Sequence, residues 1–80
     1  DYELILSQFS DEMLINLINE LPDGYRLVFN MHEVEGYSHA EIGDLLKISE
    51  VTSRSQLNRA KQVLKSKLKG LGVLKYEKTG

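Results

Sequence analysis

Apolar residues recur at three- and four-residue spacing along most of the chain, and this pattern predicts a succession of amphipathic helices. The first helix is predicted over residues 11–20, with Ser10 as its N-cap, because a serine hydroxyl accepts a hydrogen bond from a free backbone N–H. A second helix is predicted over about 23–34, after Pro22, with Gly36 behind it as a left-handed C-terminal residue. The apolar positions of the two helices are Met13, Leu14, Leu17, Ile18, Leu21, Tyr25, Val28, Phe29 and Met31.

The third predicted helix covers residues 39–46 and begins with a capping box, in which Ser38 is followed three residues later by Glu41. Its apolar residues Ile42, Leu45 and Leu46 are expected to face inward. Gly43 lies among them, although a glycine inside a helix costs about 1 kcal/mol relative to alanine. The glycine is therefore expected to mark a place where another helix approaches closely.

The fourth predicted helix runs over about 50–69 with Ser49 as its N-cap. With 100° per residue, an apolar stripe forms around Leu57, and a polar and basic arc covers the neighbouring face. The stripe is Ser53, Leu57, Ala60, Leu64 and Leu68, and the arc is Arg54, Ser55, Asn58, Arg59, Gln62, Lys65 and Lys69. We therefore expect an all-α domain over 10–69, a small bundle of about four helices. Residues 1–9 are predicted to be a linker or extension, and 70–80 a tail that packs on the bundle or on a partner.

The charge is divided unevenly along the chain. The net charge is −2, but residues 1–50 hold two basic against eleven acidic side chains, and residues 51–80 hold eight basic against one acidic. Such asymmetry indicates that the C-terminal part meets an anion, or that the two parts meet each other. A solvated lysine-rich face is the plainer interpretation.

Composition excludes several classes of protein. The chain has no cysteine, which excludes disulfides and thiolate metal sites, and no apolar run long enough for a membrane span or signal peptide. Because it begins at Asp1, we expect a domain excised from a longer protein. Two histidines, His32 and His39, are too few for a zinc site, so no metal or other cofactor is expected. Ser38 and Glu41 are occupied by the capping box, and no oxyanion site accompanies them, so we expect no enzyme and no small-molecule substrate.

The predicted helices at 39–46 and 50–69 form a helix-turn-helix candidate, since a short turn, a small residue and a basic second helix are combined. A major groove admits one α-helix, and arginine and asparagine offer bidentate pairs to guanine and adenine. The N-terminus of the first helix of the pair can hold a phosphate.

Residues 21–68 also resemble region 4 of bacterial sigma factors of the sigma-seventy family, most closely the extracytoplasmic-function group. The similarity lies in the stretches LPDGYRLVFNMHEVEGYSHAEIGDLLKISE and TSRSQLNRAKQVLKSKL, which together extend over about 48 of the 80 residues. The resemblance implies a winged-helix-like three-helical core without a wing. It also implies recognition of the minus-thirty-five promoter element, docking on the flap of the RNA polymerase β subunit, sequestration by an anti-sigma factor, and a cytoplasmic location.

Carried over residue by residue, the resemblance assigns base contacts to Arg54, Ser55, Asn58 and Arg59. It assigns phosphate contacts to Tyr37, Ser38, His39 and Lys61. The chain departs from the family at two positions, because Lys47 and Val51 stand where the family usually has glycine. A lysine at position 47 would be strained if its φ is positive.

Two alternatives stay open: the output domain of a response or quorum-sensing regulator, which would dimerise through its last helix, and an interaction module that binds an acidic partner.

Overall fold

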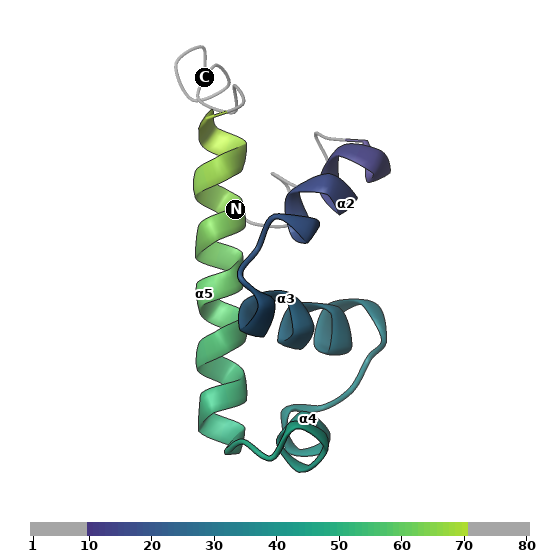
Figure 1. Ribbon diagram of the computed structural model, residues 1–80, viewed down its shortest axis with the longest axis vertical. Helices are drawn as coiled ribbons and strands as arrows, with labels where there is room; N and C mark the ends of the chain where they lie inside the picture. Colours follow the sequence, from purple (N-terminus) through teal and green to yellow (C-terminus); the bar gives the residue numbers. More distant parts are fainter. Residues whose placement is uncertain (1–9, 71–80) are drawn as a thin grey trace, which may run out of the picture.

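The computed structural model describes residues 10–70, and in this part of the chain every regular element is helical. One long helix forms an axis, and the shorter elements lie along one side of it (Figure 1). In chain order the elements are α2 (Asp11–Asn19), α3 (Asp23–Phe29), the π-helical segment η1 (Asn30–Val34), α4 (His39–Leu46) and α5 (Glu50–Leu68). The predicted all-α fold is confirmed.

Serine caps fix the starts of three helices where the sequence predicts them. The hydroxyls of Ser10, Ser38 and Ser49 accept hydrogen bonds from the backbone N–H groups three residues further on. Helix α4 has the predicted bounds, whereas α2 and α5 each end one residue early. Gly36, with φ of 83°, is in the left-handed conformation expected after the second helix.

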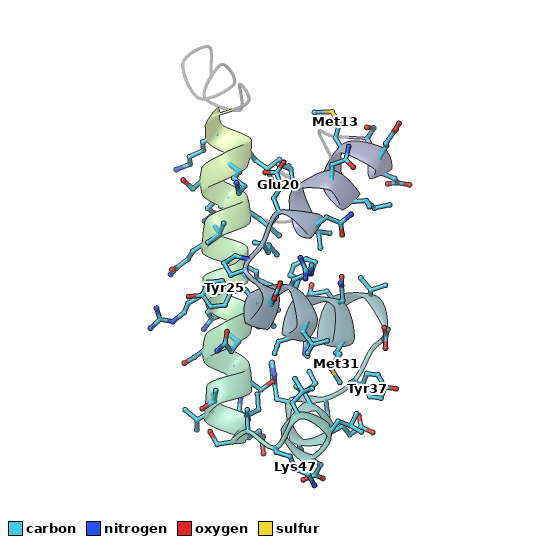
Figure 2. All side chains as sticks on the ribbon, viewed as in Figure 1. Met13, Glu20, Tyr25, Met31, Tyr37 and Lys47 are labelled. Carbon is cyan, nitrogen blue, oxygen red and sulfur yellow. The ribbon has the colours of Figure 1, made fainter. Side chains whose placement is uncertain are left out.

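The predicted second helix changes its winding half way along. It is α-helical to Phe29 and π-helical from Asn30 to Val34, where the Glu35 N–H donates to the carbonyl oxygen of Asn30, five residues earlier (3.0 Å). In this register Met31 is buried and points toward α4 (Figure 2), while Val34 faces solvent. Apolar spacing alone does not reveal the wider turn.

The core is formed where the shorter elements meet the apolar stripe of α5. Helices α3 and α4 pack along the N-terminal half of α5, and α2 lies beside its C-terminal half (Figure 1). Ten side chains make up the buried core: Leu17, Leu21, Val28, Phe29, Met31, Ile42, Leu57, Ala60, Leu64 and Leu68. Burial of this apolar surface is the dominant force holding α5 against the shorter helices.

One inward-facing prediction is wrong, because Leu45 is 58% exposed while Ile42 is fully buried. Gly43 is also buried, so the face of α4 that meets α5 is centred between positions 42 and 43. At 100° per residue, Leu45 lies more than about 100° from that centre. The close approach at the glycine thus turns Leu45 toward solvent.

Arg26 joins α2 to α3 across the turn at Pro22. Its guanidinium donates to the carbonyl oxygen of Asn19 at the end of α2 (3.1 Å) and to the Asp23 carboxylate at the start of α3 (2.7 Å). Carbonyl groups in the last turn of a helix lack intrahelical partners, and a cationic side chain there satisfies one of them.

The predictions for residues 1–9 and 71–80 fall outside the described residues. Within residues 10–70, no helix is both long enough and apolar enough to cross a membrane.

Candidate nucleic-acid interface

The turn between α4 and α5 is three residues long and tightly bonded. Lys47 is left-handed, with φ of 62° and ψ of 43°, and its N–H and that of Ile48 both donate to the carbonyl oxygen of Gly43. Ser49 then caps α5. A Cβ atom on Gly43 would lie 2.7 Å from the Ile48 carbonyl oxygen. The turn therefore folds back onto α4 at its glycine, so the close approach is made by the turn and the first residue of α5 and not by the body of another helix.

A histidine fixes the other end of α4 against α5. His39 Nδ1 lies 2.7 Å from Ser53 Oγ, and Ser53 is fully buried on α5. The His39 ring also stacks on His32, with ring centroids 4.4 Å apart and planes inclined by 13°. Sequence reasoning missed both contacts, because a seven-residue spacing between histidines carries no signal for a stack across a loop.

The surroundings of His39 favour its neutral form. Partial burial lowers the pKa of His39 below 6.5, and electrostatic interactions with His32 and Arg54 lower it further. The carboxylates of Glu50 and Glu33 act in the opposite direction and are outweighed.

The four residues predicted to contact bases all lie in the N-terminal half of α5 and are exposed: Arg54, Ser55, Asn58 and Arg59. Arg54 forms an ion pair with Glu50, one turn earlier on the same helix. Arg59 forms no ion pair with any residue in 10–70. Neither guanidinium is folded against an acidic side chain of α2, α3 or η1, so this part of the arc stays open to solvent.

The lysines on the flank of α5 behave differently from the arginines. Lys67 Nζ lies 3.1 Å from Glu20 Oε1 at the end of α2, and Lys61 Nζ lies 3.8 Å from Glu33 Oε2 on η1. One of the two outcomes expected from the charge asymmetry therefore occurs, because these two lysines meet the acidic part of the chain. Lys61, predicted to contact phosphate, is half-buried beside Glu33.

The remaining predicted phosphate contacts surround the start of α4. The capping box is complete, because Ser38 Oγ accepts from the Glu41 N–H and Glu41 Oε1 accepts from the Ser38 N–H. The hydroxyl proton of Ser38 remains as a donor, and the N–H groups of the first helical turn have no intrahelical acceptor. Tyr37 is exposed and points outward beside this end (Figure 2).

Three of the four predicted phosphate contacts thus lie together at the start of α4, where His39 contacts Ser53, the residue that precedes Arg54 on α5. The described residues contain no group of three or more histidine, aspartate or glutamate side chains arranged to hold a metal ion. A short helix, a three-residue turn and a longer basic helix define a helix-turn-helix protein.

Comparison with known proteins identifies the family. The sequence model of the family described as sigma-70, region 4 matches residues 11–64, which span all of α2 to α4 and most of α5. The chain therefore belongs to the sigma-70 region 4 family, as its sequence indicates, and has the DNA-binding role of a sigma factor at promoters. Neither the curated proteins nor the solved structures give a significant match.

Proposed function

We propose that this domain recognises the minus-thirty-five promoter element and helps to direct RNA polymerase to it, as part of a sigma factor of the extracytoplasmic-function group. Binding, without any chemical step, is its whole activity. The bacterial cytoplasm is the corresponding location, because that is where the polymerase transcribes.

One observation carries this proposal: the base-reading candidates on α5 are exposed, while its lysines 61 and 67 are paired with the acidic elements. A helix can enter a major groove only if one side of it is held by the domain and the other side protrudes. Helix α5 meets this condition, because α2, α3 and α4 pack on a single side of it (Figure 1).

In this proposal, contacts to phosphate set the register and α5 reads the bases. The start of α4, with Tyr37, Ser38 and the N–H of His39, holds one phosphate at the positive end of the helix dipole. Arg54 and Arg59 offer bidentate donors to guanine, and Asn58 offers a donor and an acceptor to adenine. Ser55 bonds to either type of base, and Lys61 adds a backbone contact once it leaves Glu33.

The polymerase contact fits the acidic elements, which pack against the apolar stripe of α5 and leave the arc exposed. We propose the flap of the β subunit as the docking site and an anti-sigma factor as the competing partner. Binding of the domain to core RNA polymerase with and without the flap tests the first contact, and loss of binding on flap deletion is the expected result.

Selection from a library of randomised duplexes, followed by affinity measurements at two salt concentrations, tests the DNA contact. We expect Arg54→Ala and Arg59→Ala each to weaken binding by about 1–3 kcal/mol and to relax the preference at one base pair. Lys67→Ala removes the same charge from the side of α5 that faces Glu20, so it should leave base preference intact. Circular dichroism checks that each variant is folded.

Two outcomes would favour the alternatives. Unchanged selectivity in both arginine variants would reject the assigned face and would favour an interaction module for an acidic protein. A dimer that forms through the end of α5 in analytical ultracentrifugation would favour an output domain of the response-regulator type.

A further inference from the structure

Val51 is an exposed apolar side chain that does not contribute to the hydrophobic core. It lies in the first turn of α5, where 69% of its surface is exposed, and it belongs to no buried cluster among residues 10–70. A β-branched residue is also a poorer helix former than alanine, because its χ1 freedom is lost against the preceding turn. Neither burial nor helix propensity therefore explains a valine at this position.

The position of Val51 places it in line with the base-reading candidates. Ser55 and Asn58 follow it by four and seven residues, the spacing of one helix face, and both are exposed. Val51 is also nearer to the N-terminus of α5 than any other residue of that face. The N-terminal residues of a recognition helix are the ones that reach base edges.

We propose that Val51 contacts the C5-methyl group of a thymine in the major groove and so selects thymine at one position of the bound site. On its major-groove edge thymine carries a C5-methyl group, and an apolar side chain can pack against this group. The restriction on χ1 helps, because a valine in a helix holds its two γ-methyl groups in one orientation. This inference rests on the proposed DNA-binding face and adds a residue to it.

The first arm of the test compares two valines with the same exposure. Val34 is also 69% exposed, but it lies on η1 and not among the candidate base contacts of α5. Val34→Ser is therefore the matched control for Val51→Ser. Each chain selects its preferred duplex from a randomised library. We expect wild type and Val34→Ser to select thymine at one position where Val51→Ser accepts several bases. Val51→Gly, which lacks any side-chain carbon, should behave like Val51→Ser.

The second arm removes the methyl group from the DNA instead of from the protein. Each thymine of the duplex selected by the wild-type chain is replaced in turn by deoxyuridine, which differs only in lacking the C5-methyl. One replacement should weaken wild-type and Val34→Ser binding about fourfold, the loss expected when the burial of one methyl group is removed. Val51→Ser should bind the two duplexes equally.

The results distinguish the thymine contact of Val51 from the proposed DNA-binding face on which it rests. If wild type binds a selected duplex with salt-sensitive affinity, but deoxyuridine costs Val51→Ser as much as wild type at every position, the thymine contact is rejected and the DNA-binding face stands. If the wild-type chain selects no sequence at all, both are rejected.

Discussion

A side-chain carbon on Gly43 would lie 2.7 Å from the carbonyl oxygen of Ile48, so the helix before the turn and the turn itself touch backbone to backbone. The same glycine's carbonyl oxygen accepts from the Lys47 and Ile48 N–H groups. This contact sets the distance between α4 and the start of α5. The geometry of the candidate DNA-binding face therefore depends on a buried residue that is not one of the proposed DNA contacts.

Gly43→Ala should destabilise the domain. The methyl group meets a backbone atom that cannot move aside, and the resulting strain outweighs the gain in helix propensity, so the free energy of unfolding should fall by about 1–2 kcal/mol. Urea denaturation followed by circular dichroism measures the change. Gly24→Ala is the control, because its Cβ would meet only the Gln56 side chain, at 3.5 Å. Equal stability of the two variants would contradict the assigned contact.

Lys47→Gly should stabilise the domain. Lys47 is the only non-glycine residue with positive φ among those described, and the left-handed conformation costs an L-residue about 1–2 kcal/mol. Part of this gain is lost, because glycine makes the unfolded chain more flexible by about 0.4–1 kcal/mol. The melting temperature should rise for Lys47→Gly and not for Lys47→Ala, which removes the side chain but keeps the strain. A rise in both variants would point to the lysine charge instead.

Acidification should weaken the attachment of α4 to α5. The pKa of His39 is lower in the folded chain than its ordinary value of 6.5, so the unfolded chain binds the proton more tightly. The contribution of His39 to stability is complete above pH 6.5. It declines as the pH falls below 6.5 and levels off once the folded-state pKa has been passed. Urea denaturation between pH 8 and pH 5 measures this slope.

His39→Gln provides the control for the pH dependence. It removes the titrating ring but keeps His32 and the carboxylates of Glu33 and Glu50, so the unfolding free energy should vary less with pH between 6.5 and 5. A slope equal to that of the wild-type chain would assign the pH dependence to another group.

Glu50→Gln should strengthen duplex binding. Glu50 holds the Arg54 guanidinium and places a carboxylate at the end of α5 that is proposed to enter the groove. An exposed ion pair is worth at most about 1 kcal/mol, so its loss should raise affinity by no more than about fivefold. Glu12→Gln makes the same charge change on α2, where it should have no effect. A gain of equal size in both variants would indicate a net-charge effect only.

Much of the fold follows from local sequence signals. Ser10, Ser38 and Ser49 each cap the helix that the sequence assigns to them, and the stripe around Leu57 is buried as its spacing predicts. Hydrogen bonds of the caps and the period of the apolar residues are local, so they can be found without knowledge of the tertiary structure.

The features that could not be predicted depend on contacts between distant residues. The π-helical turn at Asn30, the exposure of Leu45 and the stacking of His39 on His32 have no signature in the spacing of residues along the chain. Similarly, charge counting could not decide which cations are paired across helices. In the structure Lys61 and Lys67 form these pairs, whereas Arg54 and Arg59 remain exposed to solvent.

Chemical-shift mapping of the amide groups during titration with the selected duplex tests the central claim most directly. If the proposed DNA-binding face is correct, the largest changes will occur at the start of α4 and at the exposed residues of the N-terminal half of α5, including Val51, Ser55 and Arg59. Little change is expected on α2. Changes concentrated on α2 and α3, with these exposed residues of α5 unaffected, would contradict the proposed DNA-binding face.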